Sequence, residues 1–162
     1  MSPNKNRPHI FVLPEDDANR QLANGFHQEV NSIRQMQVLP VAGGWQNVLN
    51  LFEATHIAEM DKYPTRFMVL LIDFDGKQDR LNDAQVQIPS RLTDRVFILG
   101  VWSESEALKN ATRDSYETIG RNLADDCRQD TNTTWAHDLL RHNANEIERL
   151  RQHVRSILFE ST

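Results

Sequence analysis

The chain has a single cysteine and no long hydrophobic run, and each shortage excludes a class of protein. Cys127 is alone among 162 residues, so no disulfide within the chain can staple a small secreted fold. No apolar run reaches the roughly 18 residues of a transmembrane helix. The first eight residues, although they include Lys5 and Arg7, are not followed by the apolar region of a secretory signal. We therefore expect no membrane span and a cytoplasmic protein.

An excess of basic residues is also missing. Lysine and arginine total 18 against 23 aspartates and glutamates, which gives a net charge of −5. This balance excludes a general basic coat for nucleic acid, but not a local basic groove or a phosphate contact bridged by a metal. With 39% hydrophobic and 25% charged residues, the composition is that of a globular protein, and the length fits one domain.

Apolar runs and amphipathic helical patterns alternate from residue 9 to residue 101, which is typical of βαβ units. The strands are predicted at residues 9–13, 36–41, 66–73 and 96–101, and the helices between them at residues 17–33, 45–60 and 80–84. The unbroken apolar character of the strands indicates burial on both faces, as in parallel sheets. We therefore expect an α/β fold in which helices flank a four-stranded, mainly parallel sheet with Rossmann-like layering.

The pattern after residue 101 is helical only. Helices are predicted at residues 105–108 and 115–127, with Ser115 as an N-cap, and one or two more at residues 133–159. The chain then divides into a flexible N-terminus at residues 1–8, an α/β core at residues 9–101 and a helical extension at residues 102–162. We expect the extension to pack on the core, so that the whole chain forms one domain.

Two aspartates follow the third predicted strand directly. The apolar run that begins at Phe67 ends in Asp73, Phe74, Asp75 and Gly76. Side chains alternate along a strand, so Asp73 and Asp75 face the same side. Two adjacent carboxylates repel each other, and a hard divalent cation such as Mg²⁺ or Mn²⁺ relieves this cost. A polar turn in which Gly76 supplies a positive φ is the structural alternative.

The first predicted strand also ends in acids, namely Glu15, Asp16 and Asp17. The carboxyl ends of parallel strands meet at one edge of a sheet, where ligands of open α/β folds bind. Glu15 stands at the end of its strand, so we expect it to join Asp73 and Asp75 in one acidic, metal-binding centre. Asp16 and Asp17 are equally well explained as the cap and first turn of a helix.

Three further features have both a functional and a structural interpretation. Gly43 and Gly44 precede a helix and could offer backbone amides to a phosphate, or simply form a tight strand-to-helix turn. Glu104 follows the fourth strand and is either a further metal ligand or part of an acidic helix start. The arginines of the last predicted helix are interspersed with glutamates, which favours a solvated, salt-bridged face over a phosphate-binding one.

These positions together resemble the Toprim domain. That domain is shared by topoisomerases, bacterial primases, small RNA-processing nucleases and nucleases of the overcoming-lysogenization-defect type. The resemblance covers residues 9–101 and rests on Glu15, Gly43, Gly44, Asp73 and Asp75. The sequence departs from the family pattern at Asp16, since a glycine usually follows the glutamate.

The resemblance implies that Glu15 acts as a general acid or base, or as a metal ligand, and that Asp73 and Asp75 hold Mg²⁺. The implied activity is Mg²⁺-dependent phosphoryl transfer on nucleic acid, DNA or RNA, of a nuclease-like kind. A topoisomerase is disfavoured because the sequence indicates neither a nucleophilic tyrosine nor a separate DNA-gate domain. The alternative is a non-catalytic module that binds metal and nucleotide, assembles as a homo-oligomer or joins a larger protein partner.

Two other families share part of this pattern. Response-regulator receivers have acids after the first strand and an aspartate after the third, which makes a phosphoacceptor domain the third hypothesis. Against it, 57 positions separate Asp16 from Asp73, and no lysine follows a fifth strand. Haloacid-dehalogenase-type phosphatases have a strand that ends like Asp73 to Gly76, but usually as their first strand and followed by a threonine, where this chain has Lys77.

Overall fold

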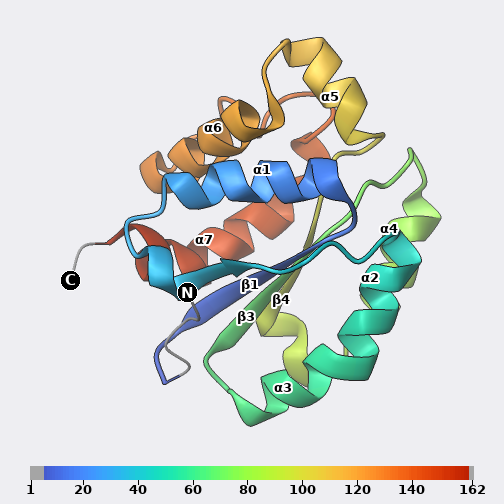
Figure 1. Ribbon diagram of the computed structural model, residues 1–162, viewed down its shortest axis with the longest axis vertical. Coiled ribbons are helices and arrows are strands. Elements are labelled where there is room, and N and C mark those ends of the chain that lie inside the picture. The colour runs from blue at the N-terminus through green and yellow to red at the C-terminus, as the bar shows by residue number, and fades with distance from the viewer. Residues whose placement is uncertain (1–5, 161–162) are drawn as a thin grey trace.

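Four parallel strands form the centre of the computed structural model, which describes residues 6–160 (Figure 1). The strands are β1 (His9–Pro14), β2 (Met36–Val38), β3 (Arg66–Leu71) and β4 (Val96–Leu99). They lie in the order β2-β1-β3-β4, and every neighbouring pair is parallel. The predicted α/β fold with a four-stranded parallel sheet is confirmed. Most of the N-terminus predicted to be flexible, residues 1–5 of 1–8, lies outside the described residues.

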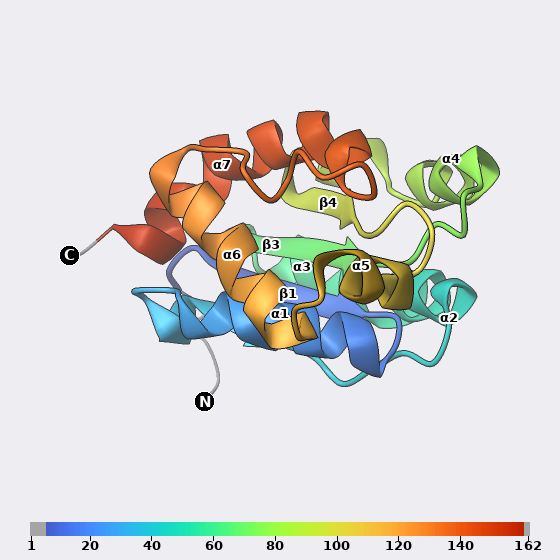
Figure 2. The same ribbon diagram turned by 90° about the horizontal axis from the view of Figure 1, so that it is seen from above.

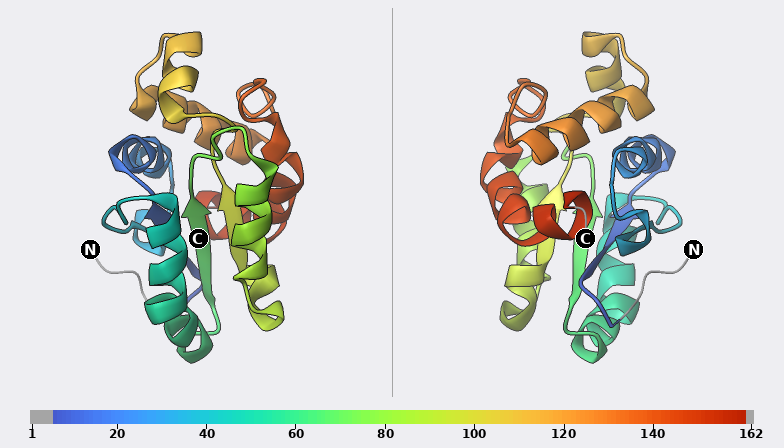
Figure 3. Two further views of the ribbon diagram at one scale, coloured as in Figure 1. Left: turned by 90° about the vertical axis from the view of Figure 1, so that its right-hand side faces the viewer. Right: turned by 90° about the vertical axis from the view of Figure 1, so that its left-hand side faces the viewer.

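Helices cover both faces of the sheet (Figures 1 and 3). The helices are α1 (Asp17–Gln28), α2 (Trp45–Leu51), α3 (Ile57–Lys62), α4 (Gln78–Val86), α5 (Ser105–Thr112), α6 (Tyr116–Gln129) and α7 (Ala144–Phe159). One hydrophobic cluster joins one face of the strands to α1, α6 and α7, and a second joins the other face to α2, α3 and α4. Within the described residues, no helix has the length and hydropathy needed to cross a bilayer.

The structure shortens several predicted elements. The second strand ends at Val38 rather than at residue 41. Leu39 and Ala42 still donate their amides to carbonyls of β1, but Pro40 between them has no N–H to donate. The first helix ends at Gln28 rather than at residue 33. The single helix predicted at residues 45–60 is divided, because a π-helical turn over Phe52–His56 joins α2 to α3.

Side chains of α7 close the outer edge of β4. Glu146 accepts a hydrogen bond from the Ile98 amide through Oε2 at 2.9 Å. Asn143 just before the helix donates from Nδ2 to the Gly100 carbonyl at 2.9 Å and accepts from the Gly100 amide at 3.3 Å. These bonds satisfy backbone groups that a fifth strand would otherwise pair. In this way the polar residues of α7 contribute to the sheet itself.

Two glycines allow α1 and α6 to lie unusually close together. A Cβ atom added at Gly25 would stand 2.1 Å from the Glu117 carbonyl oxygen, and one added at Gly120 would stand 2.0 Å from the Leu22 carbonyl oxygen. Both neighbours are backbone atoms, which cannot rotate away as a flexible side chain can. Ser115 caps α6 by accepting a hydrogen bond from the Thr118 amide, as predicted. Helix α6 is therefore packed directly on α1, which begins beside Glu15.

Substitution of Gly25 tests this close contact. In an open helical position Gly→Ala would stabilise the protein by up to about 1 kcal/mol, because alanine is the better helix former. Here we expect Gly25→Ala to lower the free energy of unfolding by about 2 kcal/mol or more, since the methyl group forces the helices apart. Urea unfolding measures the change. Asn24→Ala, in the same helix, is the control and should change stability by less than about 0.5 kcal/mol.

Candidate functional site

The predicted acidic residues lie around one cavity at the carboxyl edge of the sheet. In Figure 2 the strands point toward the side of the molecule where α2, α4 and α5 lie. The cavity has a volume of about 460 Å³. Its carboxylate lining comes from three strand ends and consists of Glu15, Asp16, Asp73, Asp75, Glu104 and Glu106. Pairing of β1 with β3 brings the first two of these ends together, because the two strands are neighbours at the middle of the sheet.

Glu15 is bound to β3 through both its backbone and its side chain. Its amide donates to the Leu71 carbonyl at 2.9 Å, and its Oε1 accepts from the Asp73 amide at 3.0 Å. Burial raises the pKa of Glu15 to about 7, and the charges of Asp73 and Asp16 add to the increase, although the Asp73 amide and Arg80 oppose it. A carboxyl group with this pKa exchanges its proton near neutral pH, which is what a general acid or base requires.

Asp73 is the most buried of these acids, with 8% of its surface exposed. Ser105, at the start of α5, donates hydrogen bonds to both carboxylate oxygens of Asp73. Its amide donates to Oδ2 at 3.0 Å and its hydroxyl to Oδ1 at 2.8 Å. Burial raises the pKa of Asp73 in spite of these two bonds. The fully buried Asn19 lies 3.3 Å from the same hydroxyl and also donates to Asp16, which is the N-cap of α1.

Asp75 and Glu104 are exposed at the rim of the cavity. Asp75 has a left-handed backbone with φ of 53°, followed by Gly76 with φ of 66°, so the chain turns sharply after the acidic pair. Asp75 Oδ2 lies 3.7 Å from Lys77 Nζ and 3.9 Å from Arg80 Nη2. Glu104 precedes the first residue of α5 without capping it through its side chain. Both carboxylates are therefore placed to meet a ligand that enters from solvent.

Gly43 and Gly44 form the turn that leads into α2. Both have positive φ, 86° and 128°. Their amides donate to the Glu15 carbonyl oxygen at 2.9 and 3.2 Å, so that the turn supports the end of β1. Contact of these amides with a phosphate, which was the functional alternative for this turn, would require the two hydrogen bonds to be replaced. In the structure the glycines position Glu15.

Several residues of the cavity were missed by the sequence interpretation. Arg80 is the one basic side chain among the described residues that line the cavity, and Trp45 and Tyr116 supply its aromatic surface. Asn19 and Ser105 were missed as well, although both are buried beside Asp73. The sequence did contain a signal for Asn19. It is a polar residue on the apolar face of an amphipathic helix, the face that carries Leu22 and Ala23, and a polar group on such a face needs a hydrogen-bond partner.

The donor set suits Mg²⁺ or Mn²⁺, because carboxylate oxygens are the ligands that these hard cations prefer. As the side chains stand, no three acidic, histidine or cysteine residues within the described part of the chain are grouped closely enough to hold a metal ion. Asp73 is turned to Ser105, Asp75 to Lys77, and Glu15 to the backbone of β3. Metal binding would therefore require some of these side chains to rotate into the cavity.

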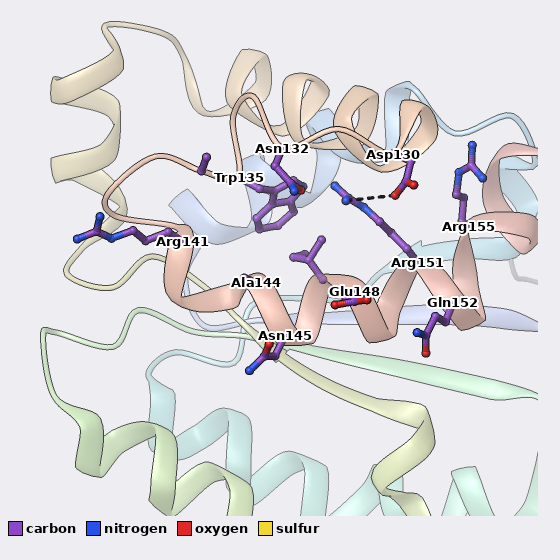
Figure 4. A pocket seen from close by; sticks show the side chains of 12 residues that line it. Asp130, Asn132, Trp135, Arg141, Ala144, Asn145, Glu148, Arg151, Gln152 and Arg155 are labelled. Carbon is purple, nitrogen blue, oxygen red and sulfur yellow. Dashed lines mark hydrogen bonds and ion pairs between the residues drawn. The ribbon is translucent and has the colours of Figure 1, made fainter.

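A larger cavity, of about 840 Å³, lies elsewhere, between α7 and the segment at residues 130–141 (Figure 4). Arg151 and Arg155 line it, but their guanidinium groups donate to backbone carbonyls at and just after the end of α6: Arg151 to Thr131, and Arg155 to Cys127 and Arg128. Arg151 also lies 3.5 Å from Asp130. These two arginines fasten α7 to α6 mainly through backbone carbonyls, and Arg151 has only 11% of its side chain exposed, unlike the solvated face, salt-bridged to glutamates, that the sequence favoured.

Comparisons with protein-family models, with curated proteins and with solved structures found no match for this chain. The resemblance to the Toprim domain therefore stays a prediction.

The raised pKa of Glu15 predicts a specific pH dependence of stability. Glu15 titrates near pH 7 when folded but near its ordinary value of 4.5 when unfolded, so the folded state loses stability as the pH rises between these values. Glu15→Gln keeps the oxygen that accepts from the Asp73 amide and removes the titration. We expect the variant to be more stable than the wild type at pH 8, by about 2 kcal/mol, and to lose this advantage at pH 4.5.

Urea unfolding at several pH values measures the difference. Asp17→Asn is the control, because a hydrogen bond from Arg20 lowers the pKa of this exposed carboxyl group. The control should show no gain in stability at pH 8. Parallel pH profiles for Glu15→Gln and the wild type would contradict the prediction.

Proposed function

We propose that the protein carries out Mg²⁺-dependent phosphoryl transfer on nucleic acid, as a nuclease-like enzyme that hydrolyses phosphodiester bonds. The observation that carries the proposal is the convergence of two distant strand ends, in which Glu15 accepts a hydrogen bond from the Asp73 amide at 3.0 Å. The carboxylates around this contact line a single cavity open to solvent. Repulsion between so many carboxylates destabilises the folded protein unless cations or protons neutralise them.

The residues divide into two roles. Asp73 and Asp75 would hold the cation, with Glu15 or Glu104 as a further ligand. When bound, Mg²⁺ or Mn²⁺ supplies a Lewis acid that stabilises negative charge on a phosphate oxygen. Glu15, with a pKa of about 7, accepts the proton of the attacking water and returns it to solvent or to the leaving oxygen. In the structure Ser105 holds Asp73 and is itself hydrogen-bonded to Asn19, and the Asp73 carboxylate would have to share or leave these bonds to reach the cation.

A second function is favoured by a separate observation. Both oxygens of Asp73 already accept hydrogen bonds from Ser105, and Asp16 stands where Toprim proteins usually have a glycine. A cavity arranged in this way also suits a module that binds a metal and a nucleotide without turnover. The two functions differ in catalysis rather than in binding, so one set of variants distinguishes them.

Cleavage assays test the proposal. We expect the wild type to nick plasmid DNA or cleave single-stranded RNA in the presence of Mg²⁺ or Mn²⁺. The double variant Asp73→Asn, Asp75→Asn should lose activity by about 100-fold or more, because it removes both ligand charges. Asp61→Asn is the matched control, since Asp61 pairs with Arg91 and does not line the cavity.

Calorimetric titration with Mg²⁺ accompanies the assay. Cation binding by the wild type, lost in the double variant but without cleavage of any nucleic acid, would support the binding module instead. A wild type that neither binds a divalent cation nor cleaves would overturn both functions.

A further inference from the structure

Arg80 occupies an unusual position in the acidic cavity. Six carboxylates line this cavity, and Arg80 is the one basic residue among its described lining residues. The guanidinium lies 4.8 Å from the centre of the Trp45 ring, and its Nη1 donates to the Asp73 carbonyl at 2.7 Å. Only 15% of the side chain is exposed. Arg80 is therefore held in one orientation by α2 and by the end of β3.

Part of the hydrogen-bonding capacity of Arg80 stays available in this orientation. A guanidinium has five N–H donors in a planar fork. Within the described residues, the bond to the Asp73 carbonyl is the one hydrogen bond that the guanidinium of Arg80 donates. Nη2 lies 3.9 Å from Asp75 Oδ2, which is an ion pair but is too long for a hydrogen bond. The donors of Nη2 can thus reach a further acceptor in the cavity.

The charge of the cavity determines which acceptor this is. A phosphate group that enters a site lined by carboxylates is repelled unless fixed positive charges face it. The backbone amides of Gly43 and Gly44, which the sequence offered as phosphate donors, already donate to the Glu15 carbonyl. Arginine is well suited to take their place, because its fork matches two oxygens of a phosphate group.

We propose that Arg80 is the phosphate-binding residue of the acidic cavity, held by Trp45 so that its Nη2 side contacts the phosphoryl group of a nucleotide or nucleic acid beside the divalent cation. This inference rests on the proposed function, because the cation has to neutralise the carboxylates before a phosphate can enter. It adds a residue and a ligand contact that the Toprim resemblance does not supply. It also assigns Trp45 a positioning role.

A purely structural role for Arg80 makes a different prediction. If Arg80 only ties α4 to the end of β3, its loss should weaken cation binding and phosphate binding together. If it binds phosphate, its loss should weaken phosphate binding without weakening cation binding. Removing a positive charge beside Asp75 favours a divalent cation, whereas removing the phosphate contact weakens the nucleotide.

The experiment compares Arg80→Gln with Lys77→Gln. Lys77 is the matched control, because its Nζ lies 3.7 Å from the same carboxylate, but its side chain is 64% exposed and does not line the cavity. Calorimetry measures Mg²⁺ binding first, and then the binding of adenosine 5′-monophosphate at saturating Mg²⁺. For Arg80→Gln we expect Mg²⁺ affinity to be unchanged or to rise severalfold, and nucleotide affinity to fall about tenfold. Lys77→Gln should leave nucleotide affinity within about twofold of the wild type.

Cleavage kinetics add a second readout. Arg80→Gln should reduce kcat by about 100-fold, as loss of one charge-stabilising donor does in other enzymes. If circular dichroism shows that Arg80→Gln is unfolded, Arg80→Lys carries the test, since it keeps the charge but loses the planar fork. Arg80→Lys should bind nucleotide with an affinity between those of the wild type and of Arg80→Gln.

The outcomes separate the two proposals. A wild type that binds Mg²⁺ and nucleotide, with nucleotide affinity unchanged in Arg80→Gln or Arg80→Lys, overturns the assignment of Arg80 alone. Parallel loss of cation and nucleotide binding in a folded Arg80 variant also overturns it, in favour of the structural role. A wild type that binds no divalent cation overturns the proposed function, and the phosphate contact with it.

Discussion

The parallel pairing of β1 with β3 is the constraint on which the acidic cavity depends. Pro14 lies opposite Leu71 in the register, and Glu15, the first residue after β1, bonds to both Leu71 and Asp73. A shift of either strand by one residue would turn its side chains to the opposite face of the sheet. Apolar residues of β1 and β3 fill the hydrophobic cores on both faces, so such a shift would also bury the wrong groups. The same packing that stabilises the fold therefore fixes the positions of the acids.

The cavity combines burial with negative charge. Burial raises the pKa of both Glu15 and Asp73, so the folded protein favours protons on these carboxyl groups. Hydrogen bonds from Ser105 and the nearby charge of Arg80 oppose this effect without removing it. A site in this condition favours neutralisation of its carboxylates, and it is on this property that the proposed cation binding rests. Its chemistry thus follows from the desolvation of the carboxylates rather than from any single contact.

The sequence was sufficient for the strands and for the acids at their ends, because both depend on local pattern. Apolar runs predicted the four strands, and the acids at the ends of the first and third runs predicted Glu15 and Asp73. Arg80 could not be found in this way, since it lies in a polar segment whose path across the cavity depends on contacts with Trp45. The roles of Gly43 and Gly44 could not be decided either. The Glu15 carbonyl that their amides bind is distant in sequence, and only the folded chain brings it to them.

The polar residues that close β4 have a consequence for the association of this protein with other chains. Exposed sheet edges are templates for strand addition, which leads to dimers or to aggregates. Asn143 and Glu146 occupy the backbone groups of one edge. At the other edge β2 offers three residues before Pro40, which lacks a donor. The fold therefore leaves few backbone groups free for strand addition at either edge of its sheet.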